Sequence, residues 1–431
     1  MKKFQRFFAI ALCVILLPLA GICSASAEET VTWWTWSTEA TVAYTKMVEL
    51  FNEKYPDIRV DLQFISNNDY WTKLPVAIAS GTGPDVYQMT RPSFELYAAS
   101  KQAMDLTDMI AASPVLQENM AQMDPTLIDT YQFGGVQMAI PYTVEATAIA
   151  YNKTLFEKAG LPDLKEIEST WTWQDLFDLA TKLTEKDASG NTTQYGFLVG
   201  ADRIPSWELI WAHGYEMFDE TGATCMIGQE GIAEALQILV DRYAAGVSPS
   251  TEATATMSSD DMFMSGKIAM IAAGIWKIPT FRGIDAFEWD VVELPFDAAT
   301  GKRVSSSNVL GFVVNPNAKS MDATARFLEV LTSPEGQAIL ADNQIYIPAN
   351  VNVRDSYFAM DKPANILAYQ RTLSYLHPNT LTQFIPYSQF TKEFTDALRE
   401  AYSGSKTALQ ALQDHQASIQ AIMDENKETF N

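Results

Sequence analysis

The feature of this sequence that most constrains its fold is a regular alternation of strand-like and helix-like segments. Residues 58–64 alternate apolar and polar side chains, which is the period of a half-buried strand. Residues 43–51 place their apolar side chains on one helical face, and residues 31–36 are rich in β-branched and aromatic side chains that favour a strand. This β-α-β order favours a parallel sheet covered by helices on both faces, because such crossovers are right-handed.

The alternation continues through the rest of the chain. A turn-forming cluster at 80–85 precedes an apolar strand at 86–89. Thr172 and Asp175 have the spacing of a capping box that opens a helix. Further strands and helices are predicted at 147–151 (strand), 155–159, 323–331 and 336–341 (helices). The sequence therefore predicts an α/β fold, and 431 residues favour two lobes over one core.

Composition excludes several classes of protein. The chain is 47% hydrophobic and contains 22 Phe, 17 Tyr and 10 Trp, which is enough apolar surface for a folded core. Its 53 acidic residues outnumber 30 basic residues and give a formal charge of −23. Because such a surface repels phosphate backbones and anionic lipid headgroups, we expect no nucleic-acid partner.

The first residues have the pattern of a signal peptide. Three basic residues precede an apolar segment at 7–17 that is too short to span a membrane, and Ala25-Ser26-Ala27 offers a cleavage site. We expect residues 1–27 to be removed by cleavage after Ala27, which gives a periplasmic or extracellular protein. Lipid anchoring at Cys23 is the alternative, but Ile22 stands where a small residue is expected, so free secretion is favoured.

Catalytic motifs are mostly missing from the sequence. The three histidines are isolated, and Cys225 is the one cysteine beyond the signal peptide, so neither a metal site nor an internal disulfide is predicted. The sequence has no GxSxG elbow, no Walker A loop and no GxGxxG, and no cofactor is expected. A secreted glycoside hydrolase that uses two carboxylates stays open as the alternative, because acidic residues are plentiful.

Tryptophans gather where strands or apolar segments end. Trp36 follows the first predicted strand, Trp276 follows an apolar segment, and Trp207 and Trp211 stand four residues apart on one helical face. An aromatic ring can stack on the C–H face of a sugar while carboxylates and amides bind its hydroxyls. Packing in a core is the alternative for each ring, and it is favoured for Trp33, which alternates with Val31.

Several segments, in a fixed order, carry a resemblance to a known family. The chain resembles the bacterial extracellular solute-binding proteins of ABC importers, in particular the carbohydrate-binding group that includes maltose-binding proteins. The segments that carry the resemblance are 31–64, 80–86, 140–146, 150–161, 170–173, 263–270, 274–276 and 331–336.

The resemblance implies a two-lobed periplasmic-binding-protein fold with a hinge and a ligand cleft between the lobes. The first lobe would comprise residues 28–142 plus 300–332, and the second residues 143–299 plus 333–431. A carbohydrate ligand would close the lobes, and the closed monomer would deliver it to the transmembrane permease of an ABC importer. This is binding without catalysis.

The resemblance also assigns roles to single residues. Glu145 corresponds to an acid that meets sugar hydroxyls, Trp276 to a stacking aromatic, and Asp85 to a motif aspartate. Arg91 lies on a segment that leads into the cleft, and Asn308 stands in Ser305–Asn308, where many relatives have a glycine pair. The full set of candidate ligand-binding residues is Trp36, Tyr70, Asp85, Arg91, Tyr142, Glu145, Trp207, Trp211, Trp276 and Asn308.

These aromatic and acidic residues favour a neutral mono- or oligosaccharide, because carboxylates accept hydrogen bonds from hydroxyls and repel anions. Arg91 is the exception. If Arg91 points into the cleft beside residues 305–307, a uronate or a phosphorylated polyol becomes the better ligand, since guanidinium pairs with carboxylate and phosphate.

Overall fold

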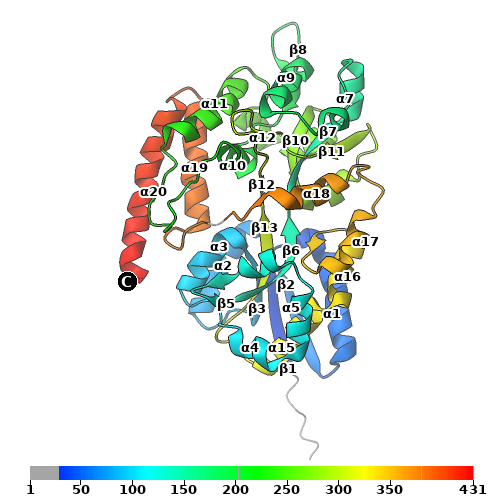
Figure 1. Ribbon diagram of the computed structural model, residues 1–431, viewed down its shortest axis with the longest axis vertical. Helices are drawn as coiled ribbons and strands as arrows, with labels where there is room; N and C mark the ends of the chain where they lie inside the picture. The colour runs from blue at the N-terminus through cyan, green and yellow to red at the C-terminus, as the bar shows by residue number, and fades with distance from the viewer. Residues whose placement is uncertain (1–28, 202, 380, 431) are drawn as a thin grey trace, which may run out of the picture.

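The computed structural model describes residues 29–201, 203–379 and 381–430, and its chain forms two lobes stacked along the long axis of the molecule (Figure 1). The predicted signal peptide, with its cleavage site after Ala27 and the alternative anchor Cys23, lies outside the described residues. No described helix is long and apolar enough to cross a membrane.

The first lobe is built on a six-stranded sheet. Its order is β14 (Ile347–Pro348), β6 (Ala139–Glu145), β13 (Asn308–Val314), β3 (Val86–Thr90), β1 (Glu29–Thr35) and β2 (Ile58–Phe64). Strands β1, β2 and β3 are parallel, as the β-α-β pattern predicts. The sheet as a whole is mixed, however, because β13 runs antiparallel to both β3 and β6. Strand β13 enters the sheet from the other lobe and therefore runs opposite to β3 and β6. The expectation of a fully parallel sheet was wrong for this strand.

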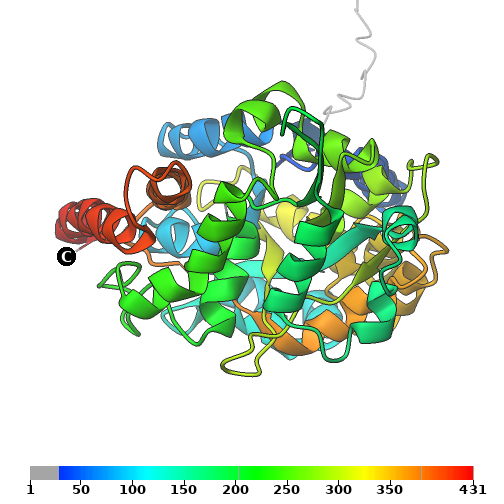
Figure 2. The same cartoon turned by 90° about the horizontal axis from the view of Figure 1, so that it is seen from above.

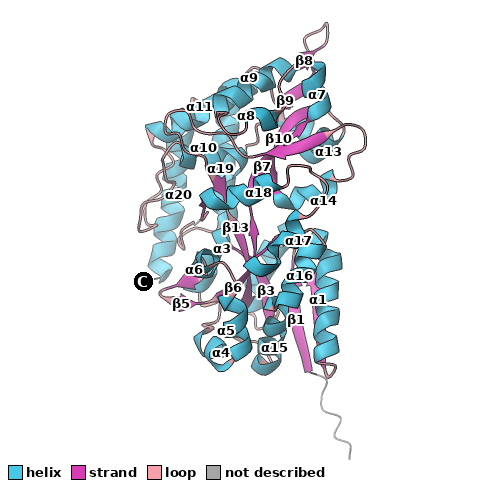
Figure 3. Cartoon of the chain, turned by 45° about the vertical axis from the view of Figure 1, so that its right-hand side comes forward, coloured by secondary structure: helices cyan, strands magenta, loops and turns pink. Residues whose placement is uncertain are grey.

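Helices cover both faces of this sheet (Figure 3). They are α1 (Thr41–Lys54), α2 (Asn67–Ala79), α3 (Arg91–Ala99), α4 (Thr107–Ala112), α5 (Pro114–Ala121), α6 (Pro125–Asp129), α15 (Met321–Thr332), α16 (Pro334–Asp342) and α17 (Arg354–Phe358). A short hairpin joins β4 (Gln132–Phe133) and β5 (Val136–Gln137). Trp33 is fully buried, and its ring centroid lies 4.8 Å from that of Tyr44 on α1, so Trp33 is the core residue that its alternation predicted.

The second lobe is built on a five-stranded sheet. Its order is β11 (Trp289–Val292), β7 (Thr147–Asn152), β10 (Ile268–Gly274), β9 (Thr192–Phe197) and β8 (Glu185–Lys186). This sheet is also mixed, since β7 runs antiparallel to both of its neighbours. A two-stranded sheet of β12 (Ser305–Ser306) and β15 (Leu376–His377) lies beside it.

The helices of the second lobe include two long C-terminal ones that lie side by side (Figure 2). The set is α7 (Lys153–Lys158), α8 (Leu164–Ile167), α9 (Trp173–Leu183), α10 (Arg203–Ala212), α11 (Glu230–Ala244), α12 (Thr251–Thr256), α13 (Ser259–Met264), α14 (Ile278–Phe281), α18 (Leu367–Thr372), α19 (Tyr387–Tyr402) and α20 (Ala408–Phe430). The predicted capping box opens α9: Oγ1 of Thr172 accepts from the Asp175 amide, and Asp175 accepts from the Thr172 amide.

The chain crosses between the lobes on adjacent strands. Strand β6 ends at Glu145 in the first sheet, and β7 begins at Thr147 in the second. The return crossing runs from β12 into β13, and the two crossings touch where the Thr147 amide donates to Oγ of Ser305 at 2.9 Å. A third crossing connects α17 with α18.

The position of the third crossing differs from the lobe boundary that the resemblance implied. We expected residues 333–431 in the second lobe. Strand β14 pairs with β6 in the first sheet, and α16 packs against α1, α15 and α17, so residues 334–358 belong to the first lobe. The boundary at 332/333 was wrong, because the sequence does not reveal which sheet takes up the two-residue strand β14. The boundaries at 142/143 and 299/300 were also misplaced, since β6 stays in the first sheet to Glu145 and β12 pairs with β15 in the second lobe.

Candidate functional site

A cleft with a volume of about 600 Å³ lies between the two lobes. Residues of both lobes line it, with Glu145 and Asn308 from the crossing strands. The first lobe contributes Trp36, Thr38, Glu39, Ser66, Asn67, Trp71, Thr90, Pro92 and Tyr346, and the second contributes Arg203, Asp260, Trp276, Lys277, Thr280 and Tyr387.

Strand direction explains why these side chains meet. Strands β1, β3 and β6 run the same way, and Trp36, Thr90 and Glu145 stand at or just after their carboxyl ends. Ligands of open α/β sheets bind outside the carboxyl ends of strands. Helix α2 begins at the same edge, where Oγ of Ser66 accepts from the Asp69 amide and caps the helix.

An aromatic cluster forms the first-lobe wall. The ring centroid of Trp36 lies 5.0 Å from that of Tyr70 and 5.1 Å from that of Trp71. Trp71 lines the cleft, whereas Tyr70 is fully buried beneath it and donates from its hydroxyl to the carbonyl of Gln88 at 2.6 Å. The predicted ligand contact Tyr70 is therefore a supporting residue, and its neighbour Trp71 presents the ring.

Glu145 and Asn308 lie at the floor of the cleft. Nδ2 of Asn308 donates to Oε2 of Glu145 at 2.8 Å, and the Glu145 side chain is buried. Burial raises the pKa of Glu145 to about 8, although nearby Arg203 and the hydrogen bond from Asn308 oppose that rise. Among the described residues, the buried Oδ1 of Asn308 has no hydrogen-bond partner. It is an acceptor that a ligand hydroxyl could satisfy.

The second-lobe wall carries two aromatic residues, Trp276 and Tyr387, and two cations, Arg203 and Lys277. Trp276 follows β10 and is partly buried, and the guanidinium of Arg203 lies 5.7 Å from the centroid of its ring. Lys277 forms an ion pair of 2.5 Å with Asp260. The positive charge of Lys277 is thus balanced within the cleft.

Two of the predicted ligand contacts lie away from the cleft. Asp85 stands at the opposite end of β3 from Thr90, where it accepts from the amide and hydroxyl of Thr32 and from the Lys319 amide at 2.7–2.8 Å. Tyr142 is fully buried, and its ring stacks on Phe312 with centroids 4.0 Å apart. Both side chains hold the first lobe together.

Arg91 does not line the cleft, although its neighbours Thr90 and Pro92 do. Its guanidinium pairs with Glu95 at 2.6 Å, one helical turn away, and its side chain is buried. Arg91 therefore does not point into the cleft, and it gives no reason to expect an anionic ligand. The cations that line the cleft are Arg203 and Lys277.

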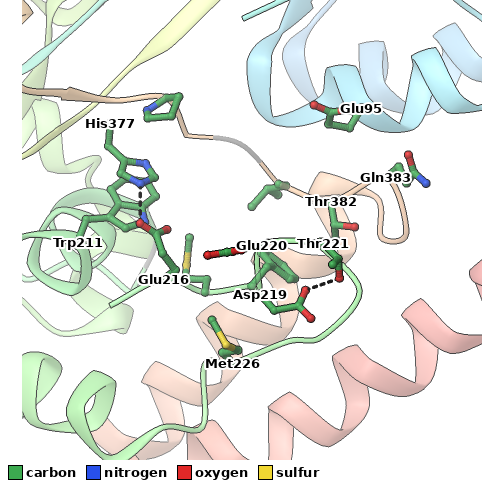
Figure 4. A pocket seen from close by; sticks show the side chains of 15 residues that line it. Glu95, Trp211, Glu216, Asp219, Glu220, Thr221, Met226, His377, Thr382 and Gln383 are labelled. Atoms are coloured by element: carbon green, nitrogen blue, oxygen red, sulfur yellow. Dashed lines mark hydrogen bonds and ion pairs between the residues drawn. The ribbon is translucent and has the colours of Figure 1, made fainter. Parts of the chain in front are cut away.

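Trp207 and Trp211 share a helical face, as predicted, but that face is turned away from the cleft. Trp207 is fully buried, and its ring lies 5.7 Å from that of Phe390. Trp211 stacks on His377 at 3.9 Å, and both line a separate cavity of about 570 Å³ in which Nε2 of His377 lies 3.1 Å from Glu216 (Figure 4).

Some of the cleft residues that were not predicted from the sequence lie next to predicted ones, and others have no sequence pattern that marks them. Trp71 and Lys277 are direct neighbours of predicted residues. Arg203 and Tyr387 come from α10 and α19, far from the other cleft residues in sequence, and no motif marks either one. Across the described ranges, no group of three or more His, Cys, Asp or Glu side chains is placed to hold a metal ion.

Comparisons with known proteins agree with this geometry. Residues 46–366 match the family described as bacterial extracellular solute-binding protein. The periplasmic sn-glycerol-3-phosphate-binding protein UgpB of Escherichia coli O1:K1 is 24% identical, with 94% of each chain covered.

Solved structures match over nearly the whole chain. The ABC substrate-binding protein Lmo0181 from Listeria monocytogenes, in complex with cycloalternan, is 25% identical with a TM-score of 0.83, over 92% of this chain and 99% of its own. The GacH receptor of Streptomyces glaucescens shares the fold at 18% identity, with a TM-score of 0.77 over 92% of this chain and 99% of its own. From the family match and the two-lobed cleft, we conclude that this chain belongs to the bacterial extracellular solute-binding proteins.

Proposed function

We propose that this protein captures a saccharide outside the cytoplasm and delivers it, as a monomer, to the permease of an ABC importer. The observation that carries the proposal is the composition of the cleft. Aromatic rings from both lobes, Trp36, Trp71 and Trp276, surround the hydrogen-bonded pair of Glu145 and Asn308. Aromatic rings can stack on the apolar face of a sugar, and the neighbouring acceptors can bind its hydroxyls. This combination suits a polyol better than any other small solute.

Charge balance favours a neutral saccharide. The charge of Lys277 is balanced by Asp260, and the carboxylate of Glu39 accepts a hydrogen bond from the hydroxyl of Tyr346 inside the cleft. Burial raises the pKa of Glu145 to about 8, which keeps its carboxyl largely protonated at neutral pH. Cycloalternan, the ligand bound to the related Lmo0181, supports the same class.

A phosphorylated polyol is the second candidate. Arg203 and Lys277 line the second-lobe wall, and a guanidinium with an ammonium is a common phosphate-binding pair. The relative UgpB is named for binding sn-glycerol-3-phosphate, which supports this alternative.

Capture requires motion but no turnover. Ligand contacts with both lobes exist only when the cleft is closed, so a ligand shifts the population toward the closed state. The crossings near Ala146, near Ser307 and between α17 and α18 are the segments that can absorb this rotation. We therefore propose a binding protein and not a glycoside hydrolase, the rival that would convert its ligand.

A thermal-shift screen of neutral, acidic and phosphorylated sugars tests the ligand class, because a ligand that binds the folded state raises the melting temperature. We expect neutral saccharides to stabilise the protein and their effect to change little between low and moderate salt. The variant Lys277→Met serves as a control, since it should weaken a phosphorylated ligand strongly and a neutral one little. Stabilisation by phosphorylated polyols alone would replace the first candidate with the second.

A further inference from the structure

A second cavity, of about 740 Å³, adjoins the cleft. It is lined by the second lobe, and it shares Arg203, Trp276, Lys277 and Tyr387 with the cleft. A third cavity, of about 400 Å³, lies between α2 and α19 and shares Asn67, Trp71 and Tyr387 with the cleft. These shared residues place both cavities directly beside the cleft.

One face of α19 joins the second and third cavities. Tyr387, Thr391, Thr395 and Arg399 line both of them, and their spacing of four residues places them on the same side of the helix. At the rise of an α-helix this row is about 18 Å long. We call this continuous space, with the row as its floor, the α19 groove; α19 runs along the second lobe beside α20 (Figure 1).

The walls of the α19 groove repeat the chemistry of the cleft. On the second lobe, Tyr243 lines it and stacks on Tyr402 with ring centroids 4.7 Å apart, and Thr254 adds a hydroxyl. On the first lobe, the amides of Asn67 and Asn68 line it. Rings, hydroxyls and amides along an extended path are groups that bind a polyol chain.

The charged side chains that α19 contributes to the groove are paired with one another. Lys392 pairs with Asp396 at 2.8 Å, and Arg399 lies 3.4 Å from the same carboxylate. Because each of these side chains already has a partner on α19, none of them requires a charged ligand.

We propose, on the basis of the proposed function, that the ligand is a linear oligosaccharide longer than a disaccharide. One part of the chain lies between Trp276 and the Glu145–Asn308 pair, and the remainder follows the α19 groove. Affinity then increases with chain length until the groove is filled. A protein built for a monosaccharide has no use for a polar groove that continues from its cleft for the length of three helical turns.

Substitutions at Thr391 and Thr395 test the proposal without touching the cleft. Thr391→Tyr and Thr395→Tyr place a ring in the floor of the groove. Thr181→Tyr on α9 is the matched control, because Thr181 and Thr391 both donate from the hydroxyl to the carbonyl four residues earlier, and Thr181 lines neither the cleft nor the groove.

The measurement is calorimetric affinity for malto-, manno-, cello- and xylo-oligosaccharides, from the monosaccharide to the hexasaccharide. In the unmodified protein we expect one series to bind with affinity that rises beyond the disaccharide. Both groove variants should lose about tenfold or more for its longer members and keep the affinity for its disaccharide, while Thr181→Tyr changes neither.

Two results would overturn the groove while leaving saccharide binding intact: affinity that is complete at the disaccharide, or groove variants that weaken short and long chains equally. If no saccharide of any length binds, although phosphorylated polyols do, the proposed function fails and the groove assignment fails with it. Circular dichroism and melting temperature establish that each variant is folded.

Discussion

The side-chain amide of Asn308 donates a 2.8 Å hydrogen bond to the carboxyl of Glu145 at the point where the two crossing strands leave the first sheet. The two residues are register partners, the last residue of β6 against the first of β13. Their contact therefore joins a carboxyl that lines the cleft to the segments on which the chain passes between the lobes. Any ligand that binds Glu145 also acts on the crossing strands.

Protonation of Glu145 predicts a pH dependence of stability. Burial raises its pKa from the ordinary 4.5 to about 8, so between these values the folded state holds a proton that the unfolded state has lost. Its contribution to the free energy of unfolding should fall as pH rises through this window and level off above it. In Glu145→Gln this component is absent. The gain in stability of the variant over the unmodified protein should therefore grow from about pH 5 to pH 8, as measured by urea unfolding.

Asp290→Asn is the comparison for that experiment. Burial also raises the pKa of the Asp290 carboxyl, but this residue lies on β11 in the second lobe, away from the cleft. It should change the pH profile of stability without changing ligand affinity, whereas Glu145→Gln should change both. An unaltered pH profile in Glu145→Gln would mean that Glu145 is ionised in the folded protein.

Two tryptophans should separate binding from folding. Trp276→Ala removes a ring that lines the cleft and should weaken saccharide binding by more than about 1 kcal/mol, with folding largely intact. Trp207→Ala removes a fully buried ring and should cost about 3 to 5 kcal/mol of stability. Calorimetry measures the affinity of both variants, and urea unfolding measures their stability. If Trp276→Ala binds the saccharide as tightly as the unmodified protein, Trp276 is a packing residue.

Asp85 should prove structural. Asp85→Ala leaves the amides of Thr32 and Lys319 without their acceptor and should cost roughly 1 to 3 kcal/mol in unfolding free energy. The affinity of the folded variant for its ligand should equal that of the unmodified protein. If the folded variant binds its ligand more weakly than the loss of stability can explain, Asp85 contributes directly to ligand binding.

Ligand binding should bring the lobes together. Small-angle X-ray scattering at saturating ligand should give a smaller radius of gyration, since hinge closure buries the cleft. A sugar that fails to raise the melting temperature is the control and should leave the scattering unchanged. An identical curve with and without bound ligand would exclude closure as the signal to the permease.

Local patterns predicted the parts of the fold that depend on neighbours in sequence. The alternation at 58–64 became β2, and the Thr172–Asp175 spacing became a capping box, because period and capping are set within a few residues. Strand direction and lobe membership depend on distant pairing. For that reason the antiparallel entry of β13 and the placement of β14 in the first lobe were not predictable from the sequence.

The same distinction applies to the cleft. Of the predicted ligand contacts, Trp36, Glu145, Trp276 and Asn308 line the cleft, and their contact with a ligand stays a prediction. The end of a strand or apolar segment marked Trp36 and Trp276, whereas the family resemblance implied Glu145 and Asn308. Tyr70 was chosen over Trp71 because composition does not show which of two adjacent helical residues faces outward. Trp207 and Trp211 share a face, but only tertiary packing shows that Trp207 is buried in the core and that Trp211 lines a separate cavity.

The most direct test of the account is isothermal titration of the protein without its signal peptide with neutral oligosaccharides, with chromatography of the sugar afterwards. The account predicts saturable heat for one saccharide class at one site per chain, and recovery of the sugar unchanged. Hydrolysed sugar would identify a glycoside hydrolase, and absence of heat with every neutral saccharide would contradict the assignment of the cleft.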